Sequence, residues 1–190
     1  MKKTLYLMRH GQTLFNLQHK IQGWCDSPLT ELGQEQARLA GKYFIENKIP
    51  IDHAYASTSE RACDTLELVT GGRIPYTRLK GLKEWNFGVF EGKDECLNPP
   101  LPYGDFFKQF GGETQEELQL RMVRTLMDVM KKEDHHVVLA VSHGGACANF
   151  ARYWEQYNKV PIQKGIKNCT IFRFTYEDEK FCLEEIIVNS

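Results

Sequence analysis

The stretch LYLMRHGQT, residues 5–13, opens on four apolar residues, and such a run predicts a buried strand. The strand then meets Arg9 and His10, two side chains that are costly to bury, and Gly11 follows them. Two interpretations are open. The strand reaches the protein surface at this point, or an active site lies at its carboxyl end.

Length and composition are those of an ordinary globular enzyme or binding domain. A chain of 190 residues predicts one domain, residues 1–190, with a substantial core. Hydrophobic residues make up 42% of the chain and charged residues 26%, as is typical of soluble proteins. The net charge of −1 offers no electrostatic footprint for nucleic acid or an anionic membrane, so we expect neither as a partner.

The six cysteines and the start of the chain indicate where the protein resides. No two cysteines have C-x-x-C spacing, so we expect free thiols rather than structural zinc or a disulfide framework. The opening MKKTLYLM places lysines before apolar residues, but the apolar run ends at Met8 and is too short for a signal peptide. These observations predict a cytoplasmic protein.

Strand patterns alternate with helix patterns along the chain. This alternation predicts a mostly parallel sheet covered by helices on both faces. Thr114 and Glu117 form a capping box at the start of one helix. The predicted strands are residues 4–9, 52–57, 74–79 and 136–142; the predicted helices are 30–47, 59–70, 115–132 and one from Gly145; residues 169–188 form an antiparallel hairpin at a sheet edge.

Polar side chains gather where three of these strands end. Ligands of parallel sheets bind beyond the carboxyl ends of the strands. The first strand ends at Arg9 and His10, the second leads into a helix that carries Arg61, and the most apolar strand ends at His143. A lone histidine or arginine is usually structural or superficial, but four at corresponding strand ends predict one site.

This set of side chains suits a phosphoryl group. Arginine presents a planar fork of donors to phosphate oxygens, and the helix starts near Ser57 and Gly144 add backbone N–H groups. A neutral imidazole can attack phosphorus, and neighbouring cations both favour the neutral ring and stabilise developing charge. Since arginines supply that charge, we expect no metal and no other cofactor in the reaction.

The leaving oxygen of such a reaction needs a proton, and LKEWNFGVFEG at residues 82–92 offers two carboxyl groups. Glu84 is the leading candidate, because Leu82 and Trp85 flank it and an apolar setting raises the pKa of a carboxyl group. Residue chemistry alone does not choose it over Glu91.

Five segments, taken in order, resemble the histidine phosphatase superfamily, also called the phosphoglycerate-mutase-like family. They are LMRHGQTLFN (7–16), QGWCDSPLTELGQEQA (22–37), ASTSERACDTLEL (56–68), LKEWNFGVFEG (82–92) and VSHGG (141–145). The resemblance covers nearly the whole chain. It implies a three-layer α/β/α sandwich, a central sheet with an antiparallel edge, and a reaction without metal.

The resemblance also implies roles for individual residues. His10 is the nucleophile that becomes phosphorylated, and Glu84, rather than Glu91, is the proton donor. The residues implied for the phosphate pocket and for substrate contact are Arg9, Thr13, Asn16, Gln22, Gly23, Arg61, His143 and Gly144, of which Arg9, Arg61 and His143 also belong to the catalytic set.

Phosphatases and mutases of this family share the pocket. The chain lacks room for the insertion that helps to cover the site of glycolytic mutases, and residues 82–92 are closer to the F-G-x-x-E-G form of the phosphatase branch. We therefore expect an acid-phosphatase-type phosphomonoesterase, a hydrolase of small phosphorylated metabolites. The alternatives are a phosphoglycerate mutase and a non-catalytic phospho-ligand binder, the latter disfavoured by the complete catalytic set. A homodimer is compatible with the sequence.

Some residues keep two interpretations or a structural one. Residues 93–113 arch over the site in relatives, and their aromatic side chains form an apolar lid or ordinary core. Lys93 and Lys108 are candidates to bind a second anionic group of the substrate. His135 and His136 are expected in a solvated turn rather than a metal site, and His53 in a surface or structural role.

Overall fold

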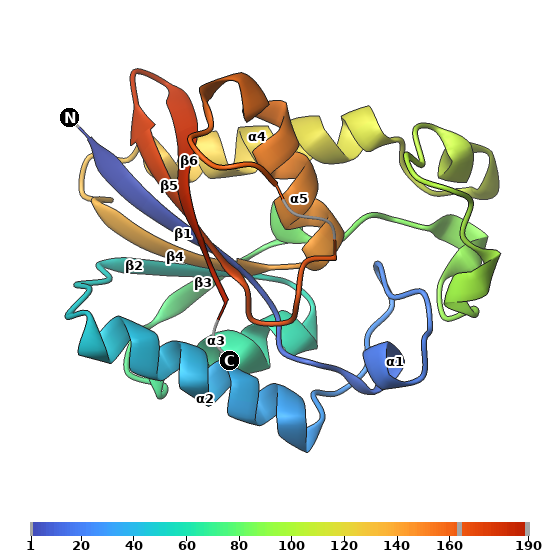
Figure 1. The fold of residues 1–190 in the computed structure, drawn as a ribbon, viewed down its shortest axis with the longest axis horizontal. Helices are drawn as coiled ribbons and strands as arrows, with labels where there is room; N and C mark the ends of the chain where they lie inside the picture. The colour runs from blue at the N-terminus through green and yellow to red at the C-terminus, as the bar shows by residue number, and fades with distance from the viewer. Residues whose placement is uncertain (1, 163–164, 189–190) are drawn as a thin grey trace.

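The computed structural model describes residues 2–162 and 165–188. In this part of the chain, six strands form one sheet in the order β3-β2-β4-β1-β5-β6 (Figure 1). The strands are β1 (Lys3–Arg9), β2 (His53–Ser57), β3 (Tyr76–Leu79), β4 (Val137–Ser142), β5 (Ile171–Glu177) and β6 (Lys180–Ile187). β1 to β4 are parallel, and β5 and β6 form an antiparallel hairpin at one edge, as predicted.

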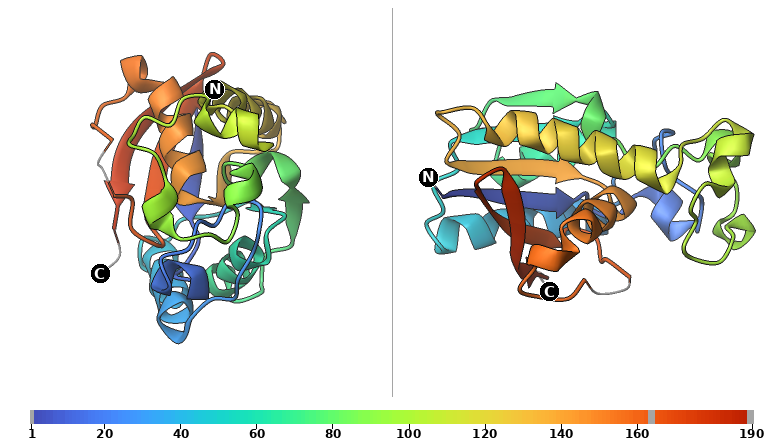
Figure 2. Two further views of the ribbon diagram at one scale, coloured as in Figure 1. Left: turned by 90° about the vertical axis from the view of Figure 1, so that its right-hand side faces the viewer. Right: turned by 90° about the horizontal axis from the view of Figure 1, so that it is seen from above.

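Helices cover both faces of the sheet. α2 and α3 lie on one face and α4 and α5 on the other (Figures 1 and 2), which confirms the three-layer α/β/α sandwich. The helices are α1 (Leu14–Leu17), α2 (Glu31–Glu46), α3 (Glu60–Thr70), α4 (Gln115–Met130) and α5 (Gly144–Tyr153), with 3-10 turns at Lys80–Leu82, Gly88–Phe90, Glu95–Leu97, Phe106–Phe110 and Glu155–Tyr157.

Local sequence signals explain where these helices begin and end. The Thr30 side chain accepts a hydrogen bond from the Gly33 N–H at the start of α2, and the predicted capping box starts α4. α3 ends at Gly71, which has a left-handed backbone with φ of 61°. The sequence missed α1 and the 3-10 turns because segments this short carry no helical periodicity.

β1 contributes to both cores. Leu5 and Leu7 face α4 and α5, whereas Tyr6 and Met8 face α2 and α3, because successive side chains of a strand point to opposite faces. Each is at most 7% exposed. Burial of such side chains contributes roughly 1.5–3 kcal/mol each, so β1 is firmly held in the centre of the sheet.

The carboxyl ends of β1, β2 and β4 lie side by side. They form an edge of the sheet that runs across the strands, distinct from the lateral edge formed by the β5–β6 hairpin. Arg9 pairs with Ser142, and Ala56 pairs with Val141. β5 runs antiparallel to β1, so its beginning, rather than its end, lies at this edge. The segment from the 3-10 turn Gly88–Phe90 to the start of α4 extends beyond the same edge (Figures 1 and 2).

The cysteines and the turn at residues 135–136 can also be compared with the sequence predictions. All six cysteines are free, as predicted. The expectation of a solvated turn at residues 135–136 was wrong for His135, which is 3% exposed. Its ring packs against His53 and bonds the Tyr55 hydroxyl, since the turn folds back onto the beginning of β2. Within the described ranges, none of the helices has the length and apolarity needed to span a bilayer.

Candidate active site

His10 lies just beyond the end of β1 and is only 4% exposed. Its Nδ1 lies 2.7 Å from the carbonyl oxygen of Gly11, so Nδ1–H donates there and Nε2 keeps its lone pair. Burial, together with the charges of Arg61 and Arg9, holds the pKa of His10 well below its usual value. The ring is therefore neutral near pH 7 and nucleophilic at Nε2.

Arg61, in the first turn of α3, lies beneath His10 and is fully buried. Its Nε is 3.3 Å from Nε2 of His10. Its two terminal nitrogens donate to the carbonyl oxygens of Gly23 and Cys25 and to the Asp26 carboxylate, at 2.7–2.9 Å. Arg61 thus places positive charge beside His10 and fixes the loop that forms one side of the site.

Two buried donors beside His10 have no partner within the described residues. They are Nδ1 of His143 and Nε of Arg9. The His143 and His10 ring centroids are 5.3 Å apart. Nε2 of His143 is 2.8 Å from the Ser57 hydroxyl, and if that hydroxyl donates, Nδ1 carries the proton. Buried donors without acceptors are costly, so these two atoms point to an anion.

The beginning of α5 supplies backbone donors. The Gly145 and Ala146 N–H groups bond Glu84, and the Cys147 N–H bonds the His143 carbonyl oxygen. The Gly144 N–H has no acceptor among the described residues, and Gly144 lines the main cavity at this edge. A free N–H at a helix N-terminus favours a bound anion.

Glu84 is a buried carboxyl group, 7% exposed. One oxygen, Oε1, accepts the N–H groups of Trp85 and Ala146, and the other, Oε2, accepts only that of Gly145, all at 2.7–2.9 Å. Burial raises the pKa of Glu84, although these N–H groups act in the opposite direction. Oε2 keeps a free lone pair for a proton, as an acid catalyst requires.

Glu91 has a different environment. Its two oxygens accept four backbone N–H groups, those of Gly23, Trp24, Cys25 and Phe87, at 2.7–3.1 Å. Every N–H of the loop 23–25 is therefore tied to this carboxylate, whose lone pairs are occupied. The structure gives Glu91 a positioning role, which the sequence alone could not separate from that of an acid.

The remaining predicted binding residues fall into two groups. Asn16 and Gln22 line the cavity. Thr13 and Gly23 are buried behind it: the Thr13 hydroxyl donates to the Gln22 amide oxygen at 2.7 Å, and the Gly23 carbonyl oxygen accepts from Arg61. A Cβ at position 23 would lie 2.1 Å from the Trp85 carbonyl oxygen, so only glycine fits.

The cavity above His10 has a volume of about 630 Å³. It extends to Leu101 and Arg152, which are exposed, so it is open to solvent. Cationic side chains on its wall are Lys20 and Arg152 besides Arg9, whereas Lys93 and Lys108 do not line it. Of the aromatic residues of 93–113, Tyr103 lines the cavity, while Phe107 is completely buried core.

Sequence reasoning missed Asn168, which precedes β5. Its amide nitrogen donates to the His10 carbonyl oxygen at 3.2 Å and to Oδ1 of Asn16 at 3.1 Å. The carbonyl oxygen of Ile166 accepts a hydrogen bond from Arg9. The available signal was topological, because the beginning of an antiparallel neighbour of β1 lies at the active-site edge.

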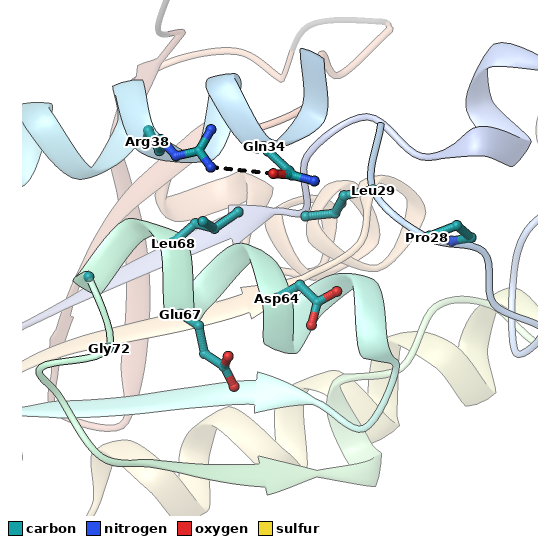
Figure 3. A pocket seen from close by; sticks show the side chains of 9 residues that line it. Pro28, Leu29, Gln34, Arg38, Asp64, Glu67, Leu68 and Gly72 are labelled. Carbon is teal, nitrogen blue, oxygen red and sulfur yellow. Dashed lines mark hydrogen bonds between the residues drawn. The ribbon is translucent and has the colours of Figure 1, made fainter. Parts of the chain in front are cut away.

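A second cavity, of about 660 Å³, lies between α2 and α3 (Figure 3). Gln34 and Arg38 line it from α2, and Asp64, Glu67 and Leu68 from α3. None of its lining residues belongs to the predicted catalytic set. The candidate active site is therefore the cavity above His10.

Comparisons with known proteins agree with this geometry. A model of the histidine phosphatase superfamily (branch 1) matches residues 5–189. The chain is 34% identical over 163 residues to a putative phosphoserine phosphatase 2 of Hydrogenobacter thermophilus, covering 75% of this chain and 74% of that protein.

Solved structures include both activities of the family. A phosphoglycerate mutase from Bacillus anthracis matches with a TM-score of 0.83 and 27% identity, covering 97% of this chain and 92% of that one. A phosphoserine phosphatase from Entamoeba histolytica, in complex with 3-phosphoglyceric acid, matches with a TM-score of 0.79 and 27% identity, covering 99% and 97%. The sequence match spans almost the entire fold, and the chain is an enzyme of the histidine phosphatase superfamily.

Proposed function

We propose that this enzyme is a phosphomonoesterase that hydrolyses small phosphorylated metabolites through a phosphohistidine at His10. The observation that carries the proposal is the unprotonated Nε2 of a neutral His10, whose only contact among the described residues is a long one of 3.3 Å from Arg61, beside two buried nitrogens without partners, on His143 and Arg9. A phosphoryl group at this position satisfies both donors and meets the nucleophile.

In the first step, Nε2 of His10 attacks phosphorus and the bond from phosphorus to the ester oxygen breaks. Arg9, His143 and the Gly144 N–H stabilise the charge that develops on the other phosphoryl oxygens. Protonated Glu84 transfers its proton to the leaving alkoxide, which departs as an alcohol. The products of this step are phosphohistidine and a Glu84 carboxylate.

In the second step, water attacks the phosphohistidine. The Glu84 carboxylate takes a proton from this water, the phosphorus–nitrogen bond breaks, and inorganic phosphate leaves. Hydrolysis needs water at the site, and the cavity connects His10 with exposed Arg152 and Leu101. This open connection supports a phosphatase over a mutase, which must hold its substrate while excluding water.

Arg152 indicates the kind of substrate. It lies on the cavity wall and has no ion-pair partner among the described residues, whereas Lys20 is paired with Asp94 at 2.6 Å. An unpaired guanidinium binds carboxylate or phosphate well. We therefore expect phosphate esters that carry a second anionic group, such as the phosphorylated three-carbon acids named for the relatives above.

The test is phosphate release from a panel of phosphate esters, with His10→Ala as the blank. Wild type should release phosphate from at least one small ester and form an acid-labile phosphoenzyme, and His10→Ala should do neither. Arg152→Ala should raise KM about tenfold or more for phosphate esters that carry a second anionic group. Arg124→Ala, on α4 and off the cavity wall, should leave KM unchanged.

The alternative is a phosphoglycerate mutase. Interconversion of 3- and 2-phosphoglycerate with a bisphosphate primer measures it. Rapid interconversion with negligible phosphate release would overturn the phosphatase proposal while retaining His10 as the nucleophile. If wild type neither releases phosphate nor becomes labelled, a non-catalytic binding role replaces both.

A further inference from the structure

A histidine–aspartate cluster lies at the edge of the sheet opposite the active site. His53 is the first residue of β2, and Asp134 and His135 lie in the turn that leads from α4 into β4. These strands are parallel, so their beginnings meet at the edge farthest from His10. The mechanism described above uses none of these side chains.

The two imidazole rings are arranged as a pair. Their centroids are 3.6 Å apart and their planes differ by 14°. The Asp134 carboxylate spans them, with Oδ1 at 2.7 Å from Nδ1 of His135 and Oδ2 at 3.2 Å from Nε2 of His53. The three residues offer ligand atoms that all lie within 4.8 Å of one another. Two ring nitrogens and one carboxylate are therefore close enough to bind one ion after a small rotation of the exposed side chains.

The other nitrogen of each ring already has an oxygen partner. Nδ1 of His53 is 3.1 Å from the Asp52 carboxylate, which itself accepts the N–H groups of His136 and Val137 at 2.8 Å. Nε2 of His135 is 2.6 Å from the Tyr55 hydroxyl. Metal-binding histidines commonly donate their second N–H to such oxygen atoms, which fixes the tautomer and orients the ring.

We propose that His53, Asp134 and His135 bind one Zn²⁺ ion. Without metal, Nδ1–H of His135 donates to the Asp134 carboxylate. When zinc takes the place of this contact, His135 shifts its proton to Nε2 and donates it to Tyr55, while Nδ1–H of His53 donates to Asp52, so the two facing nitrogens become free to coordinate. Two imidazoles and a carboxylate suit zinc, which then takes water as its fourth ligand.

The geometry at the surface allows this coordination. His135 is 3% exposed and held in place, whereas the Asp134 side chain is 72% exposed and can rotate to close on the ion. The fourth position opens to solvent on that side. The ion would clamp the turn before β4 to the beginning of β2, a structural role separate from catalysis.

Zinc titration by calorimetry tests the site, on full-length enzyme that has been treated with chelator and exchanged into metal-free buffer. Wild type should bind one Zn²⁺ per chain. His53→Ala and Asp134→Asn change accessible side chains. Each should raise the dissociation constant for zinc at least tenfold. Asp52→Asn should weaken it about 10- to 100-fold through loss of ring orientation.

His19→Ala is the matched control. His19 is exposed and lies 3.5 Å from a carboxylate oxygen of Glu95, but no second histidine joins this pair in the described structure. This variant should bind zinc like wild type. Zinc should also raise the thermal midpoint of wild type and His19→Ala by several degrees, and that of His53→Ala by much less.

Cobalt absorption separates this site from the free thiols. Co²⁺ bound by nitrogen and oxygen gives visible bands without the strong near-ultraviolet band of thiolate ligation, and Asp134→Asn should need at least about tenfold more cobalt to develop the visible bands. The proposal fails if wild type binds no stoichiometric zinc, or if His53→Ala and Asp134→Asn bind zinc as tightly as wild type. It also fails if the cobalt spectrum is that of thiolate ligation. Phosphate release does not enter any of these readouts.

Discussion

His10 is an unusual histidine because its two ring nitrogens have different and fixed environments. Nδ1 is tied to the Gly11 carbonyl oxygen, and Nε2 meets Arg61 and the cavity. His143 is likewise fully buried, and burial and Arg61 hold its pKa well below the usual value. The enzyme thus keeps two neutral imidazoles at a site whose charge comes from arginine.

These two histidines should make the fold sensitive to acid. In the unfolded chain both titrate near pH 6.5, while in the folded chain their pKa values lie well below it. Below pH 6.5 the unfolded state therefore binds more protons, and the free energy of unfolding falls as the pH falls, by about 1.4 kcal/mol per pH unit for each histidine. Glu84, with its raised pKa, acts in the opposite direction.

Urea unfolding at several pH values between 5.5 and 7.5 measures this effect. His10→Asn should reduce the slope of unfolding free energy against pH by about 0.7 kcal/mol per unit on average over this range, and by more at its acid end. Equal slopes for wild type and the variant would contradict a depressed pKa at His10.

The loss of kcat on replacing Glu84 should grow with the basicity of the leaving group. An alkoxide needs the proton that Glu84 supplies, whereas 4-nitrophenolate leaves readily without one. Glu84→Gln should therefore lower kcat for an alkyl phosphate by about 10²- to 10⁴-fold and for 4-nitrophenyl phosphate much less. Comparison of the two substrates on one variant cancels any change in stability. Equal losses would argue against an acid role.

Glu91 should matter for stability first. Each of its oxygens accepts two N–H groups, so glutamine in either orientation turns its NH₂ group toward two donors. Glu91→Gln should lower the free energy of unfolding on the order of 3 kcal/mol. Thermal unfolding checks this, with exposed Glu95→Gln as the control. A Glu91→Gln protein as stable as wild type would refute the positioning role.

At the scale of elements, the beginning of α5 connects Glu84, the proposed acid, to the proposed phosphate site. Its first N–H groups bond Glu84, and Gly144 packs against Arg9, where a Cβ would lie 3.2 Å from Nε. Glycine at these two positions lets the helix backbone approach both side chains. The pair Gly144-Gly145 is therefore a packing requirement of the site.

Gly145→Ala should damage catalysis while leaving the fold intact. Its Cβ would lie 2.8 Å from Oε1 of Glu84, so the carboxyl group must move. Alanine is a better helix former than glycine, which offsets part of the strain. We expect kcat to fall at least about tenfold, as expected for a displaced general acid. Tyr153→Ala, at the exposed end of the same helix, should keep wild-type kcat, and an equally active Gly145→Ala would contradict the assignment.

At the scale of the whole molecule, the parallel strands of the sheet place the candidate active site and the histidine–aspartate cluster at opposite ends. The carboxyl ends of β1, β2 and β4 bring His10, Arg61 and His143 together, and of these His10 lines the cavity. The beginnings of β2 and β4 hold the proposed zinc cluster at the far edge. Phosphoryl transfer should therefore be independent of any metal at the far edge.

EDTA tests whether phosphate release is independent of metal, and vanadate tests the proposed phosphoryl site at His10. Treatment with EDTA should change kcat by less than about twofold, because arginines carry the charge that a metal supplies elsewhere. Vanadate should inhibit competitively, since it resembles five-coordinate phosphorus at Nε2 of His10. Strict metal dependence of phosphate release, or resistance to vanadate, would contradict the proposed mechanism.

Much of the fold was predictable because its signals are local. The apolar runs of β1 and β4, the caps of α2 and α4 and the glycine at the end of α3 each depend on neighbours in sequence. The four charged or polar residues at strand ends followed from the rule that parallel strands end at one edge. The hairpin at residues 169–188 was predicted, but its effect on the site was not.

The roles that stayed open depend on contacts between distant segments. Glu84 and Glu91 have similar neighbours in sequence, and their difference arises from the loop 23–25, more than 60 residues away. Asn168 reaches His10 across 158 residues, and His135 stacks on His53 across 82. Arg152, instead of Lys93 or Lys108, reaches the cavity because it lies on the face of α5 that lines it, with Ala148 and Asn149.

By itself the sequence determined the strands, the longer helices, their order along the chain and the family motifs that include His10, because periodicity, capping and short motifs act over a few residues. The tertiary structure alone decided which carboxyl group keeps a free lone pair, which cation faces the cavity and which histidines meet at the far edge. Those properties depend on burial and on hydrogen-bond partners, and both exist only after the layers have packed.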